Sequence, residues 1–177
     1  MRKTWIFALS LTCLISSCKK NNDSYYIRCT IDGTAKTFNV GTYAHNDIDP
    51  SNSKIYGIGM GGFATNSDQD DWLGFWIDNV PSENEIVAGA YDHTSADFDL
   101  LATYSNESAA FDYASGSSVD EDAVTYAVTI TNHFKLTILS IDNNTIKGTF
   151  SGDFYDEGDP RNSKKSVTNG EFYLKFK

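Results

Sequence analysis

The chain has 177 residues, 24 acidic and 14 basic, so its formal net charge is -10 at pH 7. This length suits one domain, and 40% hydrophobic with 14% aromatic residues excludes a disordered chain. The acidic balance also excludes a non-specific nucleic-acid binder, because such proteins neutralise phosphates with clustered cations.

The first 17 residues are predicted to be a lipoprotein signal peptide rather than part of the fold. A basic start precedes an apolar run that is too short to span a membrane. The sequence LISSC at 14–18 then resembles a bacterial lipobox, in which the cysteine is lipidated and becomes the new N-terminus. We therefore expect acyl chains, palmitate among them, on Cys18, and a polar tether over residues 18–24. An ordinary secretory signal with a chance cysteine is the alternative.

This processing sets the expected location and the charge of the mature chain. No aspartate directly follows Cys18, which favours the outer membrane, with the periplasmic or surface orientation left open. Cleavage removes Arg2 and Lys3, leaving 12 basic against 24 acidic side chains, a balance of -12. Only Cys29 then remains besides the lipidated residue, so no internal disulfide is expected. Its alternation with isoleucines predicts a buried side chain.

Residues 25–177 alternate polar and apolar side chains almost throughout, which predicts β-strands. Asp32-Gly33 predicts a hairpin turn between the first two strands. The expected strands lie near 25–31, 35–44, 54–63, 72–78, 98–104, 124–130, 133–140, 145–156 and 171–176, with long loops near 105–123 and 157–167. About ten short strands predict a single antiparallel β-sandwich, with a closed β-barrel as the alternative.

The apolar faces of these strands give the expected core. Its members alternate with polar residues or lie on short apolar strands. They are Ile27, Cys29, Ile31, Ile58, Leu73, Phe75, Ile77, Leu136, Ile138, Phe150, Phe154, Phe172, Leu174 and Phe176.

The glycine-rich stretch at 57–62, GIGMGG, matches the G-x-G-x-x-G pattern of dinucleotide-binding proteins. That pattern requires a helix after the glycines, so that the helix N-terminus meets the pyrophosphate. An acidic loop follows here, and we therefore exclude a dinucleotide site. The alternate glycines instead leave one face of a strand bare.

Two tryptophans on the next strand carry the hypothesis of an organic ligand. Trp72 and Trp76 share one face with Gly74 between them, at an expected separation of about 13 Å along the strand. The indoles can pack across the bare glycines of a neighbouring strand. Alternatively, they form an exposed platform that stacks on sugar rings, extended by Tyr56 and Tyr91.

Candidates for metal binding and catalysis are few. Asp68, Asp70 and Asp71 lie in one loop, and further acids cluster at 120–122 and 156–159. Clustered carboxylates suit calcium, although none matches an EF-hand and a solvated acidic surface is the alternative. The scattered histidines do not form a zinc motif, and no nucleophile-elbow motif is present. We therefore assign no catalytic residue, and structural calcium is the one cofactor candidate.

Three short motifs point to a family. Ile31-Asp32-Gly33 comes early, TIKGTFSG at 145–152 follows an Asp-Asn-Asn turn, and TNGEF at 168–172 lies near the end. With the lipobox, they resemble a family of small lipoproteins of Bacteroidota that has no established activity. The resemblance implies localisation to the cell envelope and an all-β domain.

Two classes of function follow. The favoured one is a non-enzymatic binding or accessory lipoprotein of the cell envelope, with a saccharide or an envelope protein as partner. The alternative is a glycan-binding or glycan-hydrolysing surface lipoprotein. A hydrolase requires a cleft lined by acids with raised pKa, and a simple accessory protein does not.

Overall fold

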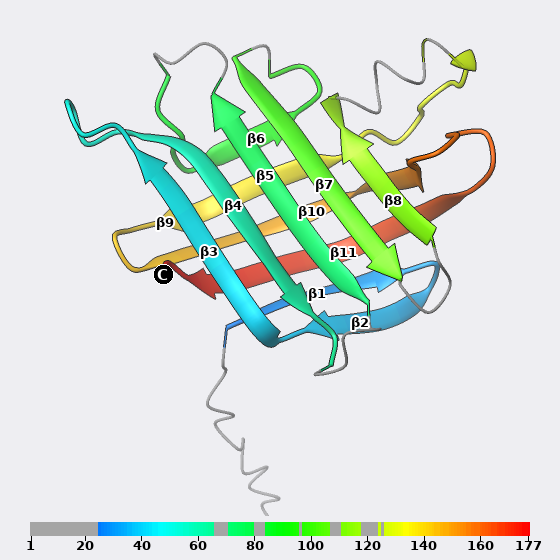
Figure 1. Ribbon diagram of the computed structural model, residues 1–177, viewed down its shortest axis with the longest axis horizontal. Helices are drawn as coiled ribbons and strands as arrows, with labels where there is room; N and C mark the ends of the chain where they lie inside the picture. The colour runs from blue at the N-terminus through cyan, green and yellow to red at the C-terminus, as the bar shows by residue number, and fades with distance from the viewer. Residues whose placement is uncertain are drawn as a thin grey trace, which may run out of the picture.

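The computed structural model describes residues 25–65, 71–79, 84–95, 97–106, 111–117, 124 and 126–177. Within them, eleven antiparallel strands form one curved sheet that nearly closes on itself, so the all-β prediction is confirmed (Figure 1). The strands are β1 (Tyr26–Ile31), β2 (Thr34–Phe38), β3 (Val40–Ile48), β4 (Ile55–Phe63), β5 (Trp72–Asn79), β6 (Gly89–Asp92), β7 (Phe98–Asn106), β8 (Phe111–Gly116), β9 (Lys135–Ile141), β10 (Thr145–Asp156) and β11 (Lys164–Lys175). No helix among the described residues is long and apolar enough to cross a membrane.

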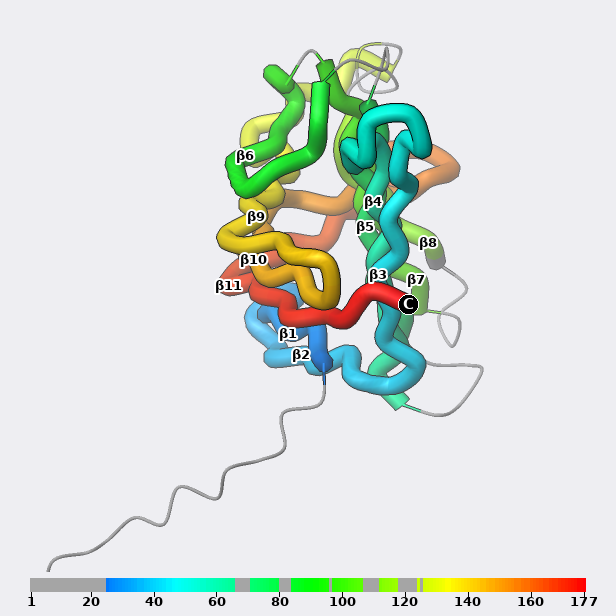
Figure 2. The backbone as a smooth tube through the Cα atoms, turned by 90° about the vertical axis from the view of Figure 1, so that its left-hand side faces the viewer, coloured from blue at the N-terminus to red at the C-terminus, as the bar shows by residue number. Residues whose placement is uncertain are grey.

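The sheet follows the order β2-β1-β11-β10-β8-β7-β5-β4-β3, and β9 and β6 extend it from β10. Strands β3, β4, β5, β7 and β8 form one layer, and the others form a second layer that crosses behind it (Figures 1 and 2). The twelve-residue strand β10 connects the two layers. Its first half pairs with β9 of the second layer, and its end pairs with β8 of the first. The fold therefore combines the two expected architectures, with sandwich-like layers and a barrel-like course.

The C-terminus lies at the seam where the sheet almost closes. Phe176 forms an isolated parallel bridge with Ala44 of β3, and the Lys177 backbone N–H donates to the Ala44 carbonyl at 3.0 Å. Phe176 directly follows β11, so these contacts join the back layer to the edge strand of the front layer. The Thr42 hydroxyl of β3 also donates to the Tyr25 carbonyl at 3.5 Å, so both ends of the described domain contribute to this seam.

The core lies between the two layers, and all fourteen predicted core residues are buried, none more than 9% exposed. Phe75 lies at its centre, with ring centroids 4.5 Å from Phe150 and 5.8 Å from Phe134. Glycines make room for these rings. A Cβ at Gly148 would lie 2.4 Å from the Phe172 ring. Gly148 is therefore a packing position in the core.

The Asp32-Gly33 turn is confirmed in geometry as well as position. Both residues have positive φ, 48° and 80°, which is the conformation of a type I′ hairpin turn. Asn169-Gly170, expected to open the last strand, lies inside β11, which begins at Lys164. Asn169 has φ 53°, and the β1 and β10 pairings with β11 shift register in this region, so the pair marks a bulge.

Two other boundaries differ from the prediction for physical reasons. Strand β8 lies inside the predicted 105–123 loop, because its small residues Ala114, Ser115 and Gly116 carry little strand propensity. The strand expected near 124–130 is absent from the described residues there. Ala127 has φ 54°, which interrupts extended backbone. Val128 and Ile130 instead pack beside Ala114 and Tyr155, apart from the main core.

Candidate functional site

The outer face of the front layer carries the residues singled out on β5. Alternation turns Leu73, Phe75 and Ile77 into the core, so Trp72, Trp76 and Asp78 point the other way. The register places these residues in rows across the sheet, and three such rows define the site. They are Gly61–Gly74–Thr103, Gly59–Trp76–Leu101 and Gly57–Asp78–Asp99, each with one residue from β4, β5 and β7.

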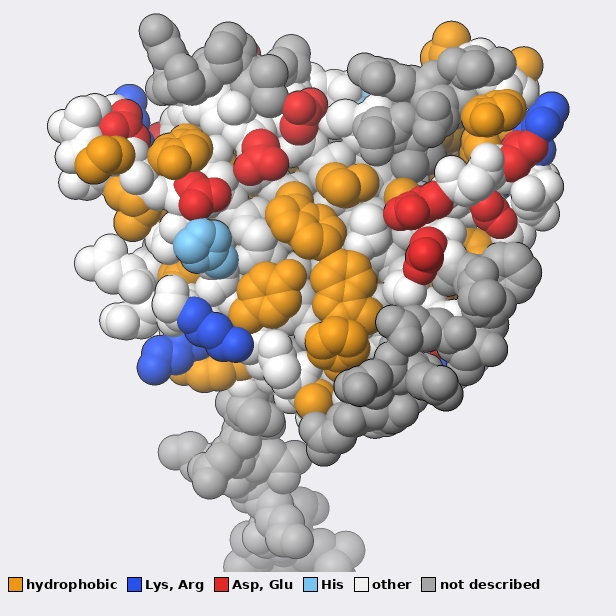
Figure 3. All heavy atoms as spheres, in the orientation of Figure 1, with side chains coloured by type: hydrophobic (Ala, Val, Ile, Leu, Met, Phe, Trp, Pro, Cys, Tyr) orange, Lys and Arg blue, Asp and Glu red, His pale blue; other side chains and the backbone are white. Residues whose placement is uncertain are grey.

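The two indoles lie over the glycines and are still partly exposed. A Cβ at Gly59 would lie 3.3 Å from Trp76 Nε1, and a Cβ at Gly74 would lie 2.4 Å from Trp72 Cη2. The rings lean toward each other over Gly74, with centroids 5.6 Å apart and planes at 43°. The separation of about 13 Å expected along the strand therefore does not apply to the rings. Figure 3 shows apolar side chains gathered in the middle of this face, with carboxylates above them.

A groove of about 500 Å³ begins at the Trp76 indole and runs over β5 and β7. The carboxylates of Asp78 and Asp99 and the side chain of Thr103 also line it. Leu101 adds an apolar surface beside the indole. The groove thus offers one flat aromatic ring and several hydrogen-bonding groups, the combination typical of small-ligand sites.

Negative charge is concentrated at one end of the groove. Asp78 lies directly opposite Asp99 in the β5–β7 pairing. Across Gly57, Asp47 Oδ2 and Asp78 Oδ1 lie 2.9 and 3.0 Å from the position a Cβ would take. Partial burial raises the pKa of Asp78, and the neighbouring charges of Asp47 and Asp99 raise it further.

Few cations balance these carboxylates. His45 Nε2 lies 3.0 Å from Asp47 Oδ1. Among the residues that the structure describes, no ion pair joins a lysine or arginine to Asp78 or Asp99. Both side chains are exposed on the wet face of the sheet.

The two tyrosines expected to extend the platform lie apart from the indoles. Tyr91 is only 5% exposed, and its hydroxyl bonds to the backbone N–H and carbonyl of Val87 at 2.9 and 2.7 Å. Tyr56 is 43% exposed but alternates with Gly57, so it points to the opposite face of β4. It lines a separate hollow of about 260 Å³ with Asn79 and Asn84.

Of the three calcium candidates, Asp68 and Asp70 lie outside the described residues. Asp71 is 9% exposed and forms an ion pair with Lys36. No group of three or more His, Cys, Asp or Glu side chains in the described segments is placed to hold a metal ion.

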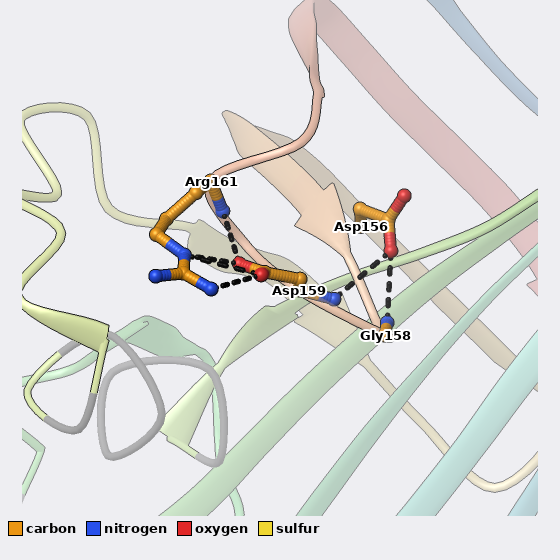
Figure 4. A network of polar contacts seen from close by, with 4 residues as sticks. All are labelled: Asp156, Gly158, Asp159 and Arg161. Carbon is orange, nitrogen blue, oxygen red and sulfur yellow. Dashed lines mark hydrogen bonds and ion pairs between the residues drawn. The ribbon is translucent and has the colours of Figure 1, made fainter.

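The acids near the start of the 157–167 loop have local partners (Figure 4). Asp156 Oδ1 accepts from the backbone N–H of Gly158 at 2.8 Å and of Asp159 at 3.1 Å. Arg161 donates to the Asp159 carboxylate from its backbone and side chain, and these bonds lower the pKa of Asp159 to about 2. These carboxylates therefore stabilise a turn.

The two cysteines expected to remain after signal cleavage differ in what the structure describes of them. Cys18 lies outside the described residues. Cys29 is buried as expected, and burial raises the pKa of its thiol to about 12.

Sequence reasoning missed Asp47, Asp99 and Thr103 as parts of the site. Asp78 could have been predicted from the sequence, because it lies two residues after Trp76 and therefore on the same face of the strand. Asp99 and Thr103 depend on the pairing of β5 with β7, which passes over β6, and Asp47 depends on the pairing of β3 with β4. No protein-family model matches the chain, and neither a curated protein nor a solved structure shows significant similarity to it.

Proposed function

We propose that this protein is a lipid-anchored, non-enzymatic binding protein of the outer membrane, and that its indole groove binds a saccharide. One observation carries the saccharide: the partly exposed Trp76 indole lines a groove that also presents the hydrogen-bonding side chains of Asp78, Asp99 and Thr103. The C–H faces of sugar rings stack on indoles. Carboxylates such as Asp78 and Asp99 accept hydrogen bonds from sugar hydroxyl groups.

The seating of the indoles supports a binding role. Trp76 packs against Gly59 and Trp72 packs against Gly74, so neither ring needs ordering when a ligand arrives. A rigid, preorganised aromatic surface lowers the entropy cost of binding. The Trp72 ring, 5.6 Å from that of Trp76, adds a second aromatic group beside the groove.

The anchor and the family remain parts of the proposal that rest on the sequence. The lipobox at 14–18 supports lipidation of Cys18. The family resemblance to lipoproteins of Bacteroidota agrees with that address. Labelling cells with palmitate tests the anchor, because wild type should be labelled and Cys18→Ala should not. Equal labelling of both proteins would contradict it.

Glycan hydrolysis is the second candidate, and one observation favours it. The groove contains an acid, Asp78, whose pKa is raised, with Asp99 opposite it. Glycoside hydrolases use two carboxylates, one of them held protonated. We favour binding because both side chains are exposed on an open face, whereas catalytic acids gain their effect in sites that exclude water.

A glycan array probed with the purified protein tests the binding proposal. We expect retention on some saccharides, and loss of that retention in Trp76→Ala. No retention on any glycan would contradict the proposed function. New reducing ends released by wild type but not by Asp78→Asn would instead establish the hydrolase.

A further inference from the structure

We propose that the saccharide bound in this groove carries free amino groups, as in an oligosaccharide of de-N-acetylated hexosamine. This inference rests on the proposed function and specifies its ligand class. It starts from the groove beside Trp76 and from the charges that line it.

Like charges lie close together at one end of the groove, and a bound cation would reduce their repulsion. Asp78 and Asp99 face each other directly in the sheet, and like charges in that position destabilise a strand pair. Asp47 adds a third carboxylate across Gly57, with His45 Nε2 3.0 Å from its other oxygen. The raised pKa of Asp78 has these two neighbours among its causes. An ammonium group between Asp78 and Asp99 would remove the repulsion and form charge-assisted hydrogen bonds.

The distances suit a sugar ring that carries its amine at the edge. Trp76 and Asp78 are two residues apart on β5, about 7 Å along the strand. A pyranose stacked on the indole therefore directs an equatorial substituent toward the carboxylates. Thr103, next to Leu101 and Asp99 on the same strand face, offers a hydroxyl for a neutral sugar oxygen. An ammonium near the ring is also attracted to the indole face.

The described residues favour this ligand over a bare metal ion. They contain no group of three or more metal-ligating side chains with suitable placement. The mature chain's balance of -12 further raises the local concentration of cationic ligands.

Calorimetry on the full chain in detergent tests the inference with two hexasaccharides of equal length. One consists of glucosamine, and the other of N-acetylglucosamine. We expect the glucosamine hexamer to bind at least about tenfold more tightly at low salt. A tenfold difference in affinity is what one additional hydrogen bond to a charged group contributes. Added salt should reduce this preference, since the charges are solvent-accessible.

Variants separate charge from stacking. Asp78→Asn and Asp99→Asn should each remove most of the preference for glucosamine, and Trp76→Ala should weaken both hexamers. Asp112→Asn is the matched control, because it removes one carboxylate from the same sheet face outside the groove. It should leave both affinities unchanged.

Three results would overturn the inference. Equal binding of both hexamers, insensitive to Asp78→Asn, would reject the amino sugar while leaving saccharide binding intact. Hexalysine binding as tightly as the glucosamine hexamer, without dependence on Trp76, would show attraction by charge alone. Failure of both hexamers and of the whole glycan array would reject the proposed function itself.

Discussion

Replacing Gly74 by alanine should disturb the paired indoles while leaving the fold intact. The added Cβ would lie 2.4 Å from Trp72 Cη2 and 3.1 Å from Trp76 Cη2. Van der Waals contact requires roughly 3.4 Å or more, so the Trp72 ring must move outward by about 1 Å. It can do so, because the clash is with the far end of a side chain on the outer face.

The expected net cost is about 1 kcal/mol in the free energy of unfolding. Loss of the seated aromatic pair costs about 0.5–1.5 kcal/mol. Re-exposing about 40 Å² of indole adds roughly 1 kcal/mol. The lower entropy of the unfolded alanine chain offsets about 0.4–1 kcal/mol. The free energy of saccharide binding should change by more than the free energy of unfolding, because the substitution moves the rings on which the sugar stacks.

Urea denaturation and circular dichroism measure the two effects. The far-ultraviolet exciton signal of two indoles at 5.6 Å should weaken in Gly74→Ala. Gly89→Ala is the control, because a Cβ there meets nothing within 4 Å. An unchanged exciton signal would show that the rings do not pack on Gly74. A loss of stability above about 3 kcal/mol would show that they cannot move outward to accommodate the added Cβ.

Three further predictions concern the core and its polar neighbours. Phe75→Ala should cost about 3–5 kcal/mol in urea denaturation, because its ring is fully buried among other phenylalanines; a cost below about 1 kcal/mol would contradict this packing. Native Cys29 should resist a thiol reagent at mildly alkaline pH and react once urea unfolds the protein, since the pKa of its thiol is raised to about 12; rapid native labelling would refute its burial. Asp153→Asn should lower stability at neutral pH by about 1–3 kcal/mol. Burial opposes ionisation of Asp153, but hydrogen bonds from Lys164 and Asn132 outweigh it and lower the pKa of that carboxyl. The ionised carboxylate therefore stabilises the fold above its unfolded pKa, and the difference from Asp153→Asn should shrink as pH falls through the lowered value; a difference independent of acid pH would contradict the reasoning.

The core was predictable because alternation reports which face of a strand is apolar. All fourteen residues that were predicted to form the core on that basis are buried. The turn at Asp32-Gly33 was predictable for a similar reason, since its backbone requirement is local.

Features that depend on pairing were not predictable. The sequence pattern put Trp72 and Trp76 on one face of β5, but it could not show that β7 brings Asp99 and Thr103 beside them. Nor could alternation show that Tyr91 is buried, with its hydroxyl held by Val87. Strand β8 was not predicted, because its small residues have weak β-strand propensity and are held extended by tertiary contacts.

The pairing of the first strand with the last sets the order in which this domain can fold. Residues of β1 near Tyr26 pair with β11 near Tyr173, a separation of almost the whole domain. A chain that emerges N-terminus first can form the local hairpins β1–β2, β3–β4 and β4–β5 early. The β1 edge then stays open until the final segment arrives, since non-local strand pairs form slowly. Completion of the sheet therefore waits for β11, however early the N-terminal hairpins form.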